Sequence, residues 1–224
     1  MEIELLQELD NQLKRHHIVP HHIIDAGARD CHESCYLADK YGVPVLAFEC
    51  NPHTIHICRN NIRNSPRVTL IDKAIHVYDG TCPFYPIKTD DEVNPCFGSN
   101  QGASSLFKSN GQYKYEVMEQ DTATVPCTRI DTVLAELGIR PNVLWMDLQG
   151  AELIALQSFG DHLDDLDIIL TEAEINPIYE GQALYRDIEA FLAPRFIKVW
   201  GNLEAEYGTN VIFVNKRYIN EYRI

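Results

Sequence analysis

Apolar residues recur with a helical period at the start of the chain and then gather into short runs. In MEIELLQELDNQLKRHH, Ile3, Leu6, Leu9 and Leu13 fall on one face of a helix. The acids near the start of this segment do not fit a secretory signal peptide. The pattern predicts a helix within residues 1–20 that packs on the rest of the chain. We expect residues 21–224 to form a single domain.

Beyond the first helix, apolar runs alternate with segments of helical period. Strands are expected at 23–27, 43–49, 68–75, 143–146, 168–170, 196–200 and 211–214. Helices are expected at 33–41, 52–62, 131–137, 151–159 and 184–192. This alternation is typical of an α/β fold with a doubly wound, mostly parallel, seven-stranded Rossmann-like sheet. A loop long enough for a hairpin, GNLEAEYGTN, joins the last two strands, so we expect one antiparallel strand near an edge.

Residues 78–128 interrupt this alternation. The segment is rich in Pro, Gly, Ser and Asn and has no helical period. Long irregular loops in compact domains are usually functional lids or disordered segments. The sequence therefore predicts a loop insertion over the carboxyl ends of the strands, where ligands of such sheets bind.

Charge and cysteine content narrow the class of partner. The formal net charge is −14 and no Lys/Arg cluster offsets it, so nucleic acid and membrane surfaces are poor partners. No apolar run approaches the ~18 residues of a membrane span. The seven cysteines are odd in number and lack CxxC spacing, which argues against a disulfide framework. We expect a cytoplasmic protein.

The stretch IIDAGARDCHE joins the first predicted strand to a helix. Gly27 matches the first glycine of a dinucleotide-binding turn, but Arg29 and His32 stand at the later glycine positions. Glu49 ends the second strand, where a carboxylate can accept hydrogen bonds from both ribose hydroxyls and would repel a 2′-phosphate. The missing glycines favour a nucleoside ligand without a pyrophosphate. S-adenosylmethionine is such a ligand, and Asp25 could meet its ammonium group.

Other interpretations of this stretch remain open at this point. A NAD-linked oxidoreductase shares the sheet and the ribose-binding acid. In a plain strand-to-helix turn, Gly27 would relieve backbone crowding and Asp25 would cap the helix. Such a turn would bind no ligand. A left-handed Cys31 would cost ~1–2 kcal/mol, which a stable domain tolerates.

Several segments together resemble the FkbM-type family of S-adenosylmethionine-dependent methyltransferases. They are IIDAGARDCHES, AFECNPHTIHICRNNI, GASSLF, VPCTRIDTVLAELGI, VLWMDLQGAELIALQSF, LTEAEINPIYEGQALYRDIEAFL and NVIFVNK. The MDLQGAE and TEAEINPIYEGQ blocks carry most of the resemblance. The chain departs from the family pattern at Arg29 and Cys31, where Asn and Gly are usual, at Cys50 (usually Pro) and at Asn210 (commonly Asp).

This resemblance implies a class I methyltransferase fold and methyl transfer to a hydroxyl of a sugar, glycan or natural-product scaffold. A catalytically weak S-adenosylmethionine-binding module is an alternative, because the turn residues are altered. We expect a small-molecule or glycan substrate, and a homo-oligomer is compatible with the sequence. The residues expected to contact the cofactor are Asp25, Gly27, Arg29, Glu49, Cys50, Asn51, Ala74, Ser105 and Asp147.

Two acids end neighbouring predicted strands. Asp147 follows the fourth strand and Glu172 the fifth, so parallel pairing would place them side by side at the carboxyl edge. Either can serve as the base that removes a hydroxyl proton, with Asp147 preferred. Close carboxylates repel, which raises one pKa or recruits a divalent cation between Asp147 and Glu172. Capping of the next helix by Asp147 is the structural alternative. Glu174 and Tyr179 are the expected substrate contacts.

Overall fold

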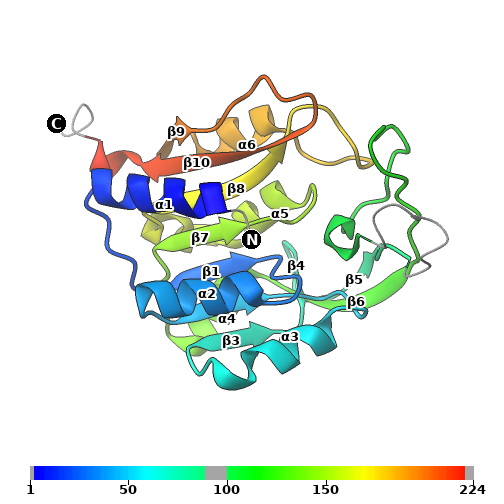
Figure 1. Cartoon of the computed structure of the whole chain (residues 1–224), viewed down its shortest axis with the longest axis horizontal. Helices are drawn as coiled ribbons and strands as arrows, with labels where there is room; N and C mark the ends of the chain where they lie inside the picture. The colour runs from blue at the N-terminus through cyan, green and yellow to red at the C-terminus, as the bar shows by residue number, and fades with distance from the viewer. Residues whose placement is uncertain (1–2, 89–99, 220–224) are drawn as a thin grey trace.

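The computed structural model describes residues 3–88 and 100–219, so residues 89–99 of the predicted loop lie outside it. Its centre is a seven-stranded sheet with the strand order β3-β2-β1-β7-β8-β10-β9 (Figure 1). The strands are β1 (Ile23–Ala26), β2 (Val45–Phe48), β3 (Val68–Ile71), β7 (Val143–Met146), β8 (Ile168–Glu174), β9 (Phe196–Trp200) and β10 (Gly208–Asn215).

The pairing directions confirm the predicted sheet. Strand β1 pairs in parallel with β2 and β7, and the same direction continues to β3 and β8. Strand β10 is antiparallel to both of its neighbours, β8 and β9. The antiparallel strand is therefore next to one edge, and β9 is the edge strand itself.

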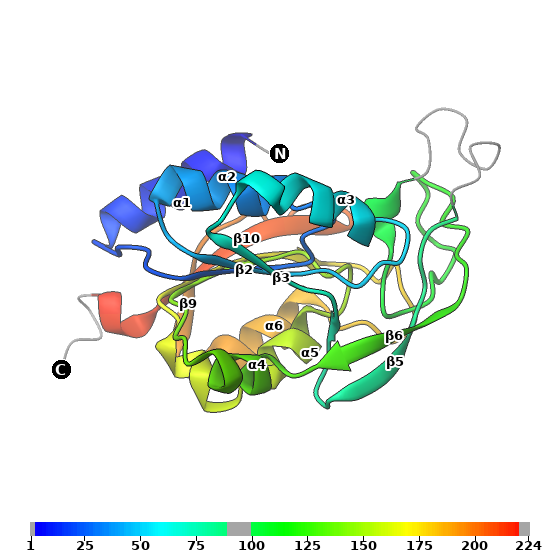
Figure 2. The same cartoon turned by 90° about the horizontal axis from the view of Figure 1, so that it is seen from below.

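Helices cover both faces of this sheet (Figure 2). One face carries α1 (Ile3–Arg15), α2 (His32–Tyr41) and α3 (Ile55–Asn61). The other face carries α4 (Ile130–Leu137), α5 (Glu152–Ser158) and α6 (Tyr185–Leu192). Short 3-10 turns lie at Ile62–Asn64, Gln101–Ala103, Gly160–Asp165 and Lys216–Tyr218.

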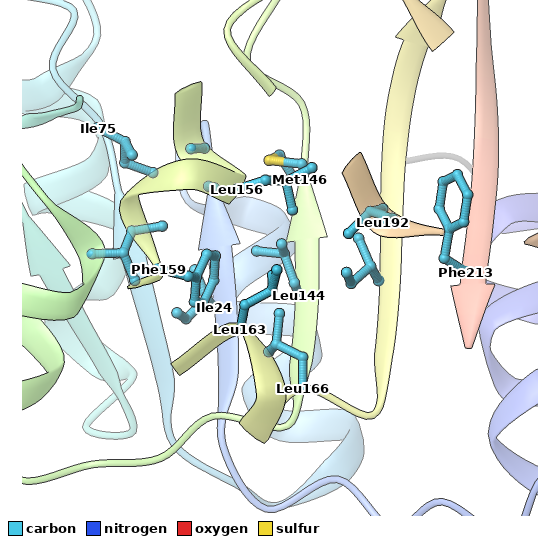
Figure 3. Close-up of a cluster of buried hydrophobic side chains, with 14 of the residues drawn as sticks. Ile24, Ile75, Leu144, Met146, Leu156, Phe159, Leu163, Leu166, Leu192 and Phe213 are labelled. Atoms are coloured by element: carbon cyan, nitrogen blue, oxygen red, sulfur yellow. The ribbon is translucent and has the colours of Figure 1, made fainter. Parts of the chain in front are cut away.

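The central strands are apolar on both faces because each face packs against helices. In β1, Ile23 belongs to the buried cluster shared with α1 and α2, whereas Ile24 belongs to the cluster shared with α4, α5 and α6. Figure 3 shows this second cluster, with Ile24, Leu144 and Phe159 close together, each fully buried. Two-sided burial explains why the strands appear in the sequence as continuous apolar runs.

The first helix packs on the sheet through the apolar face that its sequence predicts. Leu6, Leu9 and Leu13 are all buried in the cluster that includes Ile23 and Trp145. None of the helices formed by residues 3–88 and 100–219 has the length and apolar character needed to cross a bilayer.

A second, three-stranded sheet corrects two sequence expectations. The predicted strand 68–75 is two strands, because the chain leaves the main sheet after Ile71 and β4 (Ala74–Ile75) pairs elsewhere. Its partners are β5 (Gly80–Phe84) and β6 (Ala123–Thr128), in the order β4-β6-β5. Both β5 and β6 lie in the segment that was expected to be irregular. Each contains a proline, Pro83 or Pro126, which weakens the strand signal in the sequence.

Strand β8 is also longer than expected. The apolar run that predicted it stops at Leu170, yet the strand continues to Glu174. Antiparallel pairing with β10 extends over this region, with Asn210 opposite Glu172 and Gly208 opposite Glu174. The hydrophobic pattern does not detect the end of this strand, because its last residues include glutamates.

Candidate active site

A cleft lies at the carboxyl ends of β1, β2, β7 and β8, beside the second sheet. Its walls include nine residues that the sequence analysis singled out, namely Asp25, Gly27, Arg29, Glu49, Cys50, Asn51, Ala74, Asp147 and Glu172. The parallel register explains the gathering, because Ala26, Phe48 and Met146 are paired and the residues after them reach the same edge. Three other predicted site residues, Ser105, Glu174 and Tyr179, do not line the cleft.

Gly27 allows two of the turns at this edge to touch. Its φ is +91°, a left-handed conformation that L side chains rarely adopt. A Cβ at this position would overlap the carbonyl oxygen of Asp147 and lie 3.0 Å from its carbonyl carbon. The turn after β1 is also bonded to β2, since the N–H groups of Gly27 and Ala28 donate to the Phe48 carbonyl at 3.1 and 2.9 Å.

The rest of this turn is left-handed at two non-glycine residues. Cys31 has φ 62°, as the sequence analysis considered, and Arg29 has φ 50°, which it did not foresee. Each costs ~1–2 kcal/mol. Cys31 is fully buried, whereas the Arg29 side chain is half exposed. The strain persists because neighbouring contacts hold the turn, among them the Cys58 thiol donating to the Arg29 carbonyl at 3.1 Å.

Glu49 ties the turns after β1 and β2 together. Its Oε1 accepts the backbone N–H groups of Cys50 at 2.8 Å and Asn51 at 2.6 Å, and its Oε2 accepts that of Arg29 at 2.7 Å. Burial raises the pKa of Glu49 to about 7, although these backbone donors act in the opposite direction. The carboxylate is therefore held in one position before any ligand arrives.

Asn51 connects this edge to the segment between β5 and β6. It is buried, and its Nδ2 donates to Gln101 Oε1 at 3.2 Å and Ser104 Oγ at 3.1 Å. Ser104 and Gln101 both line the cleft. Ser105, which was expected to contact the cofactor, does not line the cleft. It is buried, and its hydroxyl donates to the backbone carbonyl of Gln149 at 2.7 Å.

Asp25 lies deeper than the other acids of the cleft. It is fully buried within β1 and accepts a hydrogen bond from the Ser34 hydroxyl of α2. Burial raises its pKa to about 7, and the neighbouring carboxylates add to the effect. Ala74, on β4, is buried in the opposite wall.

Asp147 and Glu172 lie side by side, as parallel pairing of β7 and β8 requires. Asp147 is exposed, whereas Glu172 is half buried. Burial, followed by the charges of Asp147 and Glu174, raises the pKa of Glu172 well above its ordinary value. Glu172 therefore favours its neutral form more than an ordinary glutamate does, and Asp147 is the more exposed acid of the pair.

Gln149 links the two acids, and the sequence analysis missed it. Its Nε2 donates to Asp147 Oδ1 at 2.7 Å and to Glu172 Oε2 at 2.9 Å. Gln149 is two residues after Asp147 and has φ 51°, so its side chain turns back over the end of the sheet. The sequence offered one signal for this role, which is an amide side chain two residues after an acid in a strand-to-helix turn.

Two expected substrate contacts are buried behind the cleft instead. Tyr179 is 1% exposed, and its hydroxyl lies 2.9 Å from both Gln149 Oε1 and the Ala103 carbonyl oxygen. Glu174 is also 1% exposed, and its Oε2 has no hydrogen-bond partner. Their substrate contact stays a prediction; for Glu174, alternation along a strand shows which side the residue faces but not what covers that side.

Glu152 shapes the turn that carries Asp147. It is fully buried, and its Oε1 accepts the backbone N–H groups of Leu148 at 2.8 Å and Gly150 at 3.3 Å. Burial raises its pKa to about 7. This acid in the first turn of α5 therefore bonds the backbone of the preceding DLQG turn.

The divalent cation that was considered between Asp147 and Glu172 does not fit these residues. Among the described residues, no three His, Cys, Asp or Glu side chains gather in a group suited to a metal ion. The space between the two carboxylates is taken by the Gln149 amide.

Comparison with known proteins identifies the family. The sequence model of the methyltransferase FkbM domain matches residues 25–207, which include both turns and both acids described above. The chain belongs to the FkbM methyltransferase family. The family and the fold that the resemblance implied are thus confirmed, and the protein is a methyltransferase by descent.

Individual relatives are distant. The chain is 27% identical over 169 residues to the 2-O-methyltransferase NoeI of Sinorhizobium fredii, covering 74% of this chain and 68% of that protein. The fibrillarin/Nop5p complex contains a chain with TM-score 0.51 and 8% identity, covering 87% of this chain and 72% of that one. A mutant of MtNAS in complex with S-adenosylmethionine has TM-score 0.49 and 13% identity over 94% of this chain. The chain spans only 61% of the length of that MtNAS structure.

Proposed function

We propose that this FkbM methyltransferase uses S-adenosylmethionine to methylate a hydroxyl oxygen of a sugar, glycan or natural-product scaffold. The observation that carries the proposal is that Glu49 and Asp147 line one cleft. Glu49 offers a fixed carboxyl group for a ribose hydroxyl, and Asp147 offers an exposed carboxyl group for a hydroxyl proton. The two groups a methyltransferase needs are thus on opposite sides of the Gly27 turn.

The residues present fit the cofactor. The three backbone donors on Glu49 leave about one of the ~4 lone-pair sites of a carboxylate for a ribose hydroxyl. Ala74, Ile75 and Phe84 add an apolar wall suited to a purine. Arg29 and His32 occupy positions where a dinucleotide turn needs glycines, which disfavours NAD. The bound cofactor would supply a methyl group carried on a positively charged sulfur.

The acids divide the proton chemistry between them. Burial and the nearby charge of Asp147 raise the pKa of Glu172 well above its ordinary value, which makes Glu172 the poorer proton acceptor, and Asp147 is the more exposed acid. Asp147 accepts the proton of the acceptor hydroxyl, a step worth ~10²–10⁴-fold in rate. Alignment of the hydroxyl oxygen with the methyl group supplies a larger share, ~7–11 kcal/mol.

Oxygen as the acceptor atom is supported by the name of the relative from Sinorhizobium fredii, a 2-O-methyltransferase. A small molecule or glycan is favoured over nucleic acid by the net charge of −14. The cysteines among the described residues are all free thiols, which supports a reducing, cytoplasmic setting.

Calorimetry tests cofactor choice first. Purified protein should bind S-adenosylmethionine and its demethylated product, and preferential binding of NAD would refute the proposal in favour of an oxidoreductase. Labelled cofactor is then incubated with a panel of glycans and hydroxylated metabolites. Methyl transfer to a hydroxyl supports the proposal. Cofactor binding without transfer to any acceptor would instead support a binding module that has lost catalysis.

A further inference from the structure

Gln149 is held in an unusual position for a surface glutamine. Both hydrogens of its amide are used, one by Asp147 Oδ1 at 2.7 Å and one by Glu172 Oε2 at 2.9 Å. The orientation of the amide follows from its partners, because an ionised carboxylate can only accept. The amide nitrogen therefore faces the acids, and the amide oxygen faces Tyr179, whose hydroxyl is 2.9 Å away.

Buried groups fix this amide from behind. Tyr179 is 1% exposed, and its hydroxyl lies between Gln149 Oε1 and the Ala103 carbonyl oxygen. The backbone carbonyl of Gln149 accepts the buried Ser105 hydroxyl at 2.7 Å. The left-handed backbone of Gln149, φ 51°, is thereby held at both the main chain and the side chain.

The amide stands where a shared cation would otherwise be needed. Two carboxyl groups side by side repel when both are charged, and proteins relieve this with a proton, a donor or a metal ion. Here the Gln149 amide supplies a donor to one carboxyl oxygen of each acid, Asp147 Oδ1 and Glu172 Oε2.

We infer that Gln149 is a positioning residue that replaces a bridging divalent cation, so that Asp147 and Glu172 work as a metal-free pair. The part of this inference that concerns methyl transfer rests on the proposed function. The part that concerns metal exclusion rests on the geometry alone. It predicts that the side chain at position 149 decides whether these two acids bind a metal.

The test is Mn²⁺ binding, measured by calorimetry and by electron paramagnetic resonance, for the full chain and for Gln149→Glu. The wild-type protein should show no Mn²⁺ site that depends on Asp147. Gln149→Glu gathers three carboxyl groups at one point and should bind Mn²⁺ at least ~10-fold more tightly than wild type. Adding Asp147→Asn to Gln149→Glu should abolish that gain.

Two results would overturn the inference. One is a Mn²⁺ site in the wild-type protein that Asp147→Asn removes, because the amide would then move aside for a cation. The other is a folded Gln149→Glu variant that binds no more Mn²⁺ than wild type. If Gln149→Glu does not fold, Gln149→His presents an imidazole beside the same acids and should bind Mn²⁺ instead, and a folded Gln149→His without binding refutes the inference equally.

A second readout separates positioning from simple support of the fold. Gln149→Met keeps the length of the side chain but donates no hydrogen bond. Once an acceptor has been identified, this variant should lose turnover at unchanged affinity for S-adenosylmethionine, because the two acids lose the donor that orients them. Wild-type turnover should be unaffected by a chelator. Turnover of Gln149→Met equal to that of wild type, or loss of wild-type turnover with the chelator, contradicts the inference. Absence of transfer to every acceptor would refute the proposed function, while the Mn²⁺ measurements would still decide the role of Gln149.

Discussion

Replacing Gly27 by alanine tests whether contact between the β1 and β7 turns organises the site. The added Cβ would overlap the Asp147 carbonyl oxygen and lie 3.0 Å from the carbonyl carbon and 3.4 Å from Leu148 Cδ2. These atoms belong to the backbone and to a packed side chain, so relief requires one turn to move away from the other.

Gly42 offers a matched control. Its φ of +69° is also left-handed, and it ends α2 with its N–H bonded to the Ala38 carbonyl. A Cβ at Gly42 would have nothing within 4 Å. Gly42→Ala therefore carries the conformational penalty of ~1–2 kcal/mol without any overlap.

The expected magnitudes follow from these two environments. Gly27→Ala adds an overpacking term of ~1–3 kcal/mol to a similar conformational penalty, for a total of ~2–5 kcal/mol. For a chain of this size each 1 kcal/mol lowers the melting temperature by ~2–4 °C, so we expect a loss of roughly 4–20 °C. Gly42→Ala should lose roughly 2–8 °C on the same scale.

Urea unfolding followed by circular dichroism measures both variants, and calorimetry measures cofactor binding. Gly27→Ala should be less stable than Gly42→Ala and should also bind S-adenosylmethionine more weakly, since its turn borders Glu49 and Asp147. Gly42→Ala should bind the cofactor like wild type. Equal destabilisation of the two variants would refute the close contact between the turns.

The other predictions concern the acids. Glu49→Ala should weaken S-adenosylmethionine binding by at least ~10-fold. The control Glu136→Gln, at an exposed position, should leave the affinity unchanged. If Glu49→Ala binds the cofactor as tightly as wild type does, Glu49 is not part of the cofactor site. Asp147→Asn should keep cofactor affinity and lose ~10²–10⁴-fold in turnover, and undiminished turnover would exclude it as the base. The pKa of Glu152 is about 7 when folded, above its ordinary value of 4.5, so its contribution to stability is fully present below pH 4.5 and is lost as the pH rises through 7. Glu152→Gln resembles the protonated acid, so its free energy of unfolding should increase relative to that of wild type between pH 5 and pH 8. Urea unfolding at several pH values measures this difference. The same pH dependence in both proteins would contradict the raised pKa of Glu152.

The amino-acid sequence determined the main sheet and part of the site. Strands buried on both faces must be apolar throughout, so β1, β2 and β7 are visible as runs even without structural information. Parallel pairing then brings whatever follows each run to one edge, which is why Gly27, Glu49 and Asp147 could be assigned to a common cleft.

Only the tertiary structure decided the features that depend on contacts between distant segments. The second sheet pairs Phe84 with Ala123, a partnership that no local pattern encodes. Ser105, Glu174 and Tyr179 are polar residues that the tertiary packing buries. Gln149 became part of the site only when β7 and β8 set two acids within reach of one amide. A sequence specifies which groups reach an edge of the sheet, whereas side-chain partners across that edge are settled by the three-dimensional packing.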